Sequence, residues 1–192
     1  MFARLLAALI ALFAKKPTVA DPLPTNTPTP EPIRKPVSKG AAIGGVAGAA
    51  TIAAIVAFIG PWEGRRYVAY QDIVGVWTIC EGHTKGVKAG DVATDAQCDE
   101  MAAQDVAEHN AGIRACITRP MPQNVEVAFT SLAFNVGVGA FCGSTALRRY
   151  NAGDDSGACD ALNMWNKAGG RVVRGLVNRR AAESALCKKG ST

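Results

Sequence analysis

The sequence predicts an α+β fold in which a small β-containing lobe precedes a larger helical lobe. β-Branched and aromatic residues, interrupted by Gly75, are concentrated over residues 67–79, which is typical of short strands and turns. Thr94 and Gln97 have the spacing of a capping box, and apolar residues follow them at helical intervals. Further helices are expected over residues 124–134, 144–150, 156–165 and 172–188.

The first 39 residues divide into two segments that we do not expect to form part of this fold. Residues 1–14 are mostly apolar, but a bilayer-spanning helix needs about 20 residues, and the role of this segment is open. Residues 15–39 contain seven of the ten prolines in the chain. Such a composition favours an extended, solvated linker over a packed helix or sheet.

Residues 40–60 form an uncharged, Gly- and Ala-rich span that is long enough to cross a membrane. Its few strongly apolar side chains give an insertion free energy of only roughly −2 to −4 kcal/mol. Gly44 and Gly48 also form a GxxxG pattern, which is found in dimerising membrane helices. A third interpretation is a helix buried inside a soluble domain. The composition alone does not decide between an anchor, a dimerising helix and a buried helix.

Charge and cysteine content narrow the classes of function. The formal net charge is +5, but residues 1–60 carry six basic and two acidic side chains, so the rest of the chain is close to neutral. We therefore expect no nucleic-acid partner, because the basic residues flank an apolar span as in membrane topology signals. Six cysteines, all after residue 79, indicate structural disulfides in an oxidising compartment.

The preferred disulfide pairing follows the expected elements. A Cys80–Cys98 bond would close a short loop in the small lobe, Cys142–Cys159 would join two short helices, and Cys116–Cys187 would tie the last helix to the core. Cys80 and His83 also have a CxxH spacing, but no second close ligand pair accompanies them. We therefore expect no metal and no cofactor.

Acidic residues with contrasting surroundings follow the apolar span. Glu63 comes directly after it, where a less polar setting favours the protonated form, whereas Asp72 lies in a polar turn that favours the ionised form. Glycoside hydrolases use such a pair, one carboxyl group as a general acid and the other as a carboxylate. Two surface acids would look the same in sequence, and Glu81 is a third acid in the stretch.

Residues 62–84, WEGRRYVAYQDIVGVWTICEGHT, resemble the active-site signature of the phage-type lysozymes (muramidases, glycoside hydrolase family 24). In that signature a Glu-Gly is followed by an Asp after eight residues, a Thr after five more, and then a Gly-His. Glu63, Asp72, Thr78 and His83 occupy these places. The stretches TDAQCDEMAAQDV, SLAFNVGVGAF and GLVNRRAAESALC resemble the connecting, central and C-terminal helices of the family, so the resemblance covers about residues 61–187.

The resemblance implies a lysozyme-like fold, with an active-site cleft between the two lobes, and a hydrolytic reaction. Glu63 would be the general acid that protonates the glycosidic oxygen. Asp72 would stabilise positive charge on the sugar and help to place a water molecule, which Thr78 would bind from the opposite side. The substrate would be peptidoglycan, cleaved between N-acetylmuramic acid and N-acetylglucosamine.

Four further residues receive roles from the same resemblance. His83 would form a structural pair with Asp105, Asn135 would line the cleft, and Arg171 would neutralise or orient Glu63. Asn135 has a second interpretation, as an amide that only satisfies a helix end.

The weakly apolar span before Glu63 resembles that of the signal-anchor-release endolysins. This implies an anchor at residues 40–60 and a catalytic domain at residues 61–192. The protein would engage the host secretion machinery, hold its domain on the periplasmic side of the inner membrane, and then be released as a periplasmic monomer that causes host cell lysis. Two alternatives remain: a lytic transglycosylase, which needs no water-positioning carboxylate, and a tethered peptidoglycan-binding module, which needs no catalytic residues.

Overall fold

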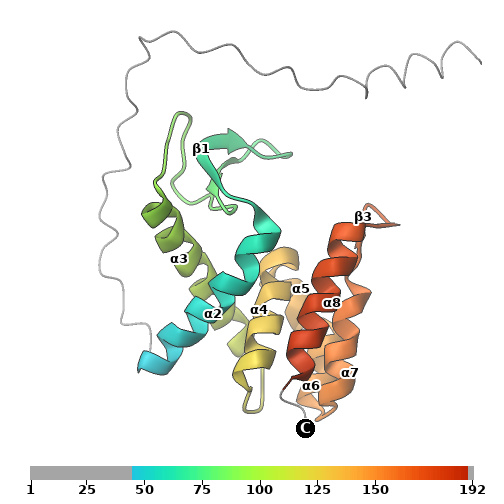
Figure 1. Cartoon of the computed structure of the whole chain (residues 1–192). Coiled ribbons are helices and arrows are strands. Elements are labelled where there is room, and N and C mark those ends of the chain that lie inside the picture. The colour runs from blue at the N-terminus through green and yellow to red at the C-terminus, as the bar shows by residue number, and fades with distance from the viewer. Residues whose placement is uncertain (1–44, 190–192) are drawn as a thin grey trace, which may run out of the picture.

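The structure is a computed structural model that describes residues 45–189 of the 192-residue chain, with side chains from residue 48 onward (Figure 1). The segments at residues 1–14 and 15–39 and the start of the 40–60 span lie outside the described residues. The described elements, in chain order, are α2 (Gly45–Glu63), β1 (Arg66–Gln71), β2 (Trp77–Cys80), α3 (Asp95–Arg114), α4 (Gln123–Val136), α5 (Val138–Cys142), α6 (Thr145–Asn151), α7 (Asp155–Ala161), a 3₁₀ turn (Leu162–Met164), β3 (Lys167–Ala168), β4 (Arg171–Val172) and α8 (Arg174–Lys188).

The small lobe contains an antiparallel hairpin of β1 and β2, in which Tyr70 pairs with Thr78 and Gln71 with Trp77. Gly75 turns the chain between the strands with a φ of +83°, a conformation that favours glycine. A β-bulge interrupts the pairing near the start of β1. The strands and the turn at Gly75 agree with the α+β fold expected from the sequence.

The long helix α3 begins at the predicted capping box. The Thr94 hydroxyl accepts a hydrogen bond from the Gln97 backbone N–H, and the Gln97 side chain returns a bond to the Thr94 backbone. The helix starts beside the β-hairpin and runs toward the helical lobe (Figure 1). Its first half buries Cys98 against the small lobe, and Ile113 near its end is buried in the helical core. One continuous helix therefore connects the two lobes.

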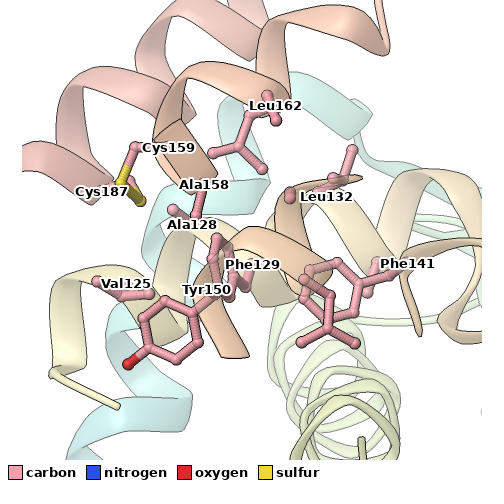
Figure 2. Packing of buried hydrophobic residues seen from close by; sticks show 14 of the residues in the cluster. Val125, Ala128, Phe129, Leu132, Phe141, Tyr150, Ala158, Cys159, Leu162 and Cys187 are labelled. Carbon is pink, nitrogen blue, oxygen red and sulfur yellow. A yellow bond between two sulfur atoms is a disulfide. The ribbon is translucent and has the colours of Figure 1, made fainter. Parts of the chain in front are cut away.

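The helical core is built around α4, nine residues of which are buried. Phe129 is completely buried, and its ring centroid lies 5.2 Å from that of Phe141 and 5.2 Å from that of Tyr150 (Figure 2). Helices α5, α6, α7 and α8 surround this face of α4. The second, two-stranded hairpin of β3 and β4 lies before α8 and was not predicted, because its strands are only two residues long.

Helix α2 packs on the domain with one apolar edge. Ile52, Ile55 and Ile59 recur at intervals of three and four residues and are buried, together with Val106 of α3 and Val127 of α4. In the structure, the described part of this segment is therefore a helix packed against the domain, which matches the third interpretation made from the sequence. The helix α2 also continues across the expected domain boundary between residues 60 and 61. Within residues 45–189, no helix combines the length and apolarity that crossing a membrane requires.

All six cysteines form disulfides, and two of the three predicted pairings are wrong. The Cys80–Cys98 bond is present as expected. The other two bonds are Cys116–Cys142, with a Cα–Cα distance of 5.9 Å, and Cys159–Cys187, with a Cα–Cα distance of 5.6 Å. The bonds predicted for Cys142–Cys159 and Cys116–Cys187 do not form, because α5 packs back on α3 while α7 lies along α8 (Figures 1 and 2).

Candidate active site

Glu63 is the last residue of α2, so the packing of that helix sets its position. Gly64 follows with a φ of +72°, and this left-handed residue lets the chain leave the helix and enter β1 two residues later. The Glu63 side chain is 21% exposed, which leaves it partly accessible to a ligand. Glu63 thus lies at the junction between the helical part and the β-hairpin.

Arg65 fixes the chain just after Glu63. Its guanidinium donates to Glu81 at 2.5 Å, to Asp95 at 2.8 Å and to Asp99 at 2.6 Å. Tyr67 also donates to Asp95, at 2.8 Å. These carboxylates raise the pKa of Arg65, with the bond to Asp99 as the largest cause. The link holds the end of α2 against β2 and the start of α3.

Arg179 of α8 is the basic residue that contacts Glu63. Its Nη1 donates to Glu63 Oε1 at 2.5 Å, although the two residues are 116 positions apart in the sequence. Its Nη2 donates to the Ser131 carbonyl oxygen at 3.2 Å, and the Arg179 side chain is only 4% exposed. The contact places a buried positive charge beside a partly exposed acid.

Arg171 was expected to neutralise or orient Glu63, and in the structure Arg179 makes that contact. Arg171 lies in β4 of the short hairpin and is exposed. Within residues 45–189, no hydrogen bond or ion pair joins Arg171 to Glu63. The sequence carried a weak signal for Arg179, since it is followed at i+4 by Glu183, and such a pair on an otherwise buried helix face indicates a structured ionic cluster.

Asp72 lies in the turn between β1 and β2. Its Oδ1 accepts hydrogen bonds from the backbone N–H groups of Val74, at 2.9 Å, and Val76, at 2.8 Å. Its own backbone N–H donates to the Val76 carbonyl oxygen at 3.0 Å. The turn therefore fixes the orientation of the carboxylate while leaving the residue partly exposed.

Thr78 is held rigidly on β2. It is 4% exposed, and its hydroxyl donates to the Val76 carbonyl oxygen at 3.0 Å. The same strand carries Ile79 and Cys80, which belong to the core of the small lobe. A hydroxyl whose proton is already donated has its oxygen lone pairs left for another donor.

A cavity of about 380 Å³ lies at the junction of the two lobes. Glu63 lines it from α2, and Asn135 lines it from the end of α4. Asp72 and Thr78 lie in the β-hairpin and do not line this cavity, and in the described part of the chain no hydrogen bond connects either of them to Glu63. The remaining lining residues are Glu81, Gly82, Thr84, Lys85, Asp105, Glu108, His109 and Phe134.

Asn135 is tied to α8 by a hydrogen bond. Its side-chain oxygen accepts from Arg180 Nη1 at 3.2 Å, and Arg180 is fully buried. With the oxygen occupied, the amide NH₂ group of Asn135 remains the part of the side chain that can donate to a ligand. Asn135 therefore lines the cavity and also binds a buried arginine of α8, whereas in the described residues no hydrogen bond joins its side chain to the end of its own helix.

The expected contact between His83 and Asp105 is present. Nδ1 of His83 lies 2.8 Å from Asp105 Oδ2, and Nε2 lies 3.1 Å from the Lys85 carbonyl oxygen. The hydrogen bond to Asp105 is the main cause of a raised pKa at His83. Both nitrogens are therefore engaged, and the pair joins the loop after β2 to α3. Cys80 is in a disulfide, so it cannot serve as the thiolate of a CxxH zinc site.

The comparisons with known proteins agree with the fold. The family model for phage lysozyme matches residues 60–183, a range that includes Glu63 and the first ten of the fifteen residues of α8. The chain belongs to the phage lysozyme family. The resemblance inferred from the sequence is thereby confirmed, and with it the assignment of the chain as a lysozyme-type glycosidase, an enzyme of the endolysin class.

The phage lysozyme family members that resemble this chain include named endolysins. This chain is 43% identical over 129 residues to the SAR-endolysin of Enterobacteria phage P21, and the aligned region covers 67% of this chain and 78% of that protein. This chain is also 43% identical over 134 residues to the SAR-endolysin of Pseudomonas phage phiKMV, and the aligned region covers 68% of this chain and 83% of that protein.

Solved phage lysozyme structures share the fold. A P22 lysozyme mutant has a TM-score of 0.64 at 36% identity, over 69% of this chain and 94% of that one. The active form of the P1 phage endolysin Lyz has a TM-score of 0.65 at 28% identity, over 80% of this chain and 98% of that one. The predicted lysozyme-like fold is therefore confirmed.

Proposed function

We propose that this phage lysozyme is an endolysin that hydrolyses the β-1,4 bond between N-acetylmuramic acid and N-acetylglucosamine in bacterial peptidoglycan, and that this hydrolysis lyses the host cell. The observation that carries the proposal is the placement of Glu63. It is an acid that lines the cavity between the lobes, is partly shielded from water, and is held by one buried arginine.

Glu63 is the general acid in this proposal. It lines the cavity from the end of α2, and Arg179 holds its Oε1 at 2.5 Å. A general acid must lie within hydrogen-bond reach of the oxygen that it protonates, and the contact with Arg179 gives the Glu63 side chain a defined position at the cavity.

Asp72 and Thr78 supply the water-handling part of the site. The Asp72 carboxylate is oriented by two backbone N–H donors, so its second oxygen is available to stabilise positive charge on the sugar. The Thr78 hydroxyl oxygen is fixed by its bond to Val76 and can accept a hydrogen bond from the attacking water. Both groups lie in the β1–β2 hairpin, which follows directly after the helix that carries Glu63 (Figure 1).

Analysis of the reaction products tests hydrolysis. Purified peptidoglycan treated with the enzyme is expected to yield muramic acid residues with reducing ends, because water accepts the glycosyl group in hydrolysis. Reduction of the digest with borohydride followed by mass spectrometry distinguishes these ends from 1,6-anhydro ends. Anhydro products would identify a lytic transglycosylase, and the absence of any released glycan would identify a binding module.

The anchor interpretation of residues 40–60 extends the proposal to location. The relatives named above are called SAR-endolysins, and the three isoleucines that pack α2 on the domain are among the seven strongly apolar residues of the span. In our proposal the host secretion machinery places this span in the inner membrane with the domain in the periplasm. The span later leaves the membrane and folds as α2, which brings Glu63 to the cavity and produces a periplasmic monomer.

Membrane fractionation tests release. We expect the protein to move from the membrane fraction to the soluble periplasmic fraction when the membrane potential is collapsed, since insertion is worth only a few kcal/mol. Replacing Gly44, Gly45 and Gly48 with leucine should keep the protein in the membrane. At Gly48 an added side chain meets no atom within 4 Å, so that change leaves the packing of α2 intact. Retention of the wild-type protein after depolarisation would contradict release and indicate a permanent anchor.

A further inference from the structure

Glu183 is a fully buried acid on α8 that none of the roles above uses. Its Oε1 accepts a hydrogen bond from the Ser131 hydroxyl at 2.7 Å and from Arg180 Nη2 at 2.8 Å. It also accepts from Arg179 Nε at 3.3 Å. Its Oε2 lies 2.7 Å from Arg180 Nε. Glu183 is therefore in contact with two buried guanidinium groups at once.

Each of these two arginines also contacts a residue of the candidate active site. Arg179 uses the end of its guanidinium group opposite Glu183 to reach Glu63, at 2.5 Å. Arg180 uses Nη1 to reach Asn135, at 3.2 Å. Glu183 is thus linked to the cavity through the two arginines: Arg179 joins it to Glu63, and Arg180 joins it to Asn135.

We propose that Glu183 is a positioning residue for the general acid: it fixes the orientation of Arg179, which contacts Glu63, and offsets one of the two positive charges that Arg179 and Arg180 carry beside the site. The proposal rests on the general-acid role given to Glu63 above. Glu183 touches no part of the cavity itself, so it acts only through its neighbours.

The reason is electrostatic. Arg179 and Arg180 carry two positive charges, and Glu183 reduces the net charge of this buried group to +1. Without Glu183, the two arginines would carry an uncompensated charge of +2, with Arg179 in direct contact with Glu63 and Arg180 bonded to Asn135, and low local polarity strengthens such interactions. An acid facing that charge would stay ionised at a pH where the reaction needs it protonated.

Burying these three charged side chains costs desolvation free energy, so stabilisation of the fold alone does not explain the cluster. Loss of water raises the pKa of Glu183 and lowers the pKa of Arg180, because each charged form is disfavoured in the interior. Apolar residues of similar volume often replace buried ion pairs without loss of stability. An ionic cluster whose arginines contact two cavity residues is better explained by the charge and geometry that it imposes on the site.

The other charged groups near Glu63 come from different elements and are not in contact with the cluster. They line the same cavity and are present in every variant compared below, so they do not account for differences between variants. These groups are Glu81, Lys85, Asp105, Glu108 and His109.

A series of charge variants tests the proposal through the pH dependence of kcat/KM on purified peptidoglycan. Its alkaline limb reports loss of the proton from the general acid of the free enzyme. Glu183→Gln, with a net charge of +2 in the cluster, should move this limb to lower pH by about one unit or more. Arg180→Gln, with a net charge of 0, should move it to higher pH. The double variant, with the net charge returned to +1, should restore the wild-type position.

Glu126→Gln is the matched control. Glu126 is also a buried acid, 3% exposed, and accepts hydrogen bonds from Arg114 at 2.6 and 2.8 Å, but it has no contact with Glu63 or Arg179. This variant should lose stability in thermal unfolding yet keep the wild-type alkaline limb. The control separates general destabilisation from an effect on the general acid.

The outcomes are distinct. Opposite shifts in the two single variants, with restoration in the double variant, support the positioning role. If Glu183→Gln does not fold, an upward shift for Arg180→Gln still supports it. If the alkaline limb of kcat/KM stays at the wild-type pH in every folded variant, the positioning role of Glu183 is overturned. A wild-type enzyme without activity, or an active Glu63→Gln enzyme, would instead refute the proposed function.

Discussion

Glu63→Gln is expected to lower the rate of peptidoglycan hydrolysis by about 100- to 10,000-fold. The amide keeps the shape of the side chain and can still contact Arg179, but it has no proton to give to the glycosidic oxygen. The rate of release of reducing ends from purified peptidoglycan measures the effect directly. Circular dichroism and thermal unfolding should show a folded protein, because Glu63 is partly exposed and belongs to no apolar cluster.

Glu108→Gln provides a control within the same cavity. Glu108 also lines it, but its side chain is 59% exposed and pairs with Lys85 at the surface. A surface ion pair of this kind contributes about 1 kcal/mol or less, and its loss should leave the hydrolysis rate within a few-fold of wild type. Near wild-type activity of Glu63→Gln would remove Glu63 from the catalytic role.

Ile55→Asp is expected to abolish the active, folded form of the enzyme. Ile55 of α2 is fully buried against α3 and α4, so the change removes a core side chain and places a charge in apolar surroundings. We expect a loss of at least about 3 kcal/mol in the free energy of unfolding, which is a large fraction of the stability of a typical domain. Because α2 carries Glu63, hydrolysis should be lost even where the rest of the domain remains folded.

Ala53→Asp is the matched change on the opposite face of α2, where Ala53 is exposed. Both variants place one acid near the middle of the proposed anchor and should impede membrane insertion to a similar extent. Only Ile55→Asp should reduce the specific activity and the unfolding temperature of protein isolated in soluble form. Equal activity of the two isolated variants would mean that docking of α2 is not needed to place Glu63.

The general fold could be predicted because its signals are local. The capping box at Thr94 sets the start of α3, and Gly75 marks the β-turn by a conformation that other residues rarely adopt. The short hairpin of β3 and β4 could not be predicted, since two-residue strands have no usable periodicity. The disulfides show the same limit: Cys80 and Cys98 close a local loop, whereas the other pairs depend on how distant helices pack.

The candidate site was predictable to the extent that it lies in one contiguous stretch. Glu63, Asp72 and Thr78 occur within sixteen residues and carry a recognisable spacing. Arg179 was missed, and Arg171 was chosen in its place, because the contact with Glu63 spans 116 positions and exists only once α8 lies against α4 and α2. The sequence alone gave no information about which of these arginines would be buried beside Glu63.

The disulfides divide the chain into a part that is covalently fixed and a part that is not. All three bonds join residues after position 79, and no cysteine of the sequence precedes them, so no disulfide ties α2 to the domain. Apolar packing, the Glu63–Arg179 ion pair and hydrogen bonds hold α2 in place. In the proposed release from the membrane, the three bonds could therefore form while α2 is still inserted, and the later docking of α2 would require no thiol chemistry. Under that proposal, apolar burial of α2 sets the docking step, and the redox state of the periplasm does not.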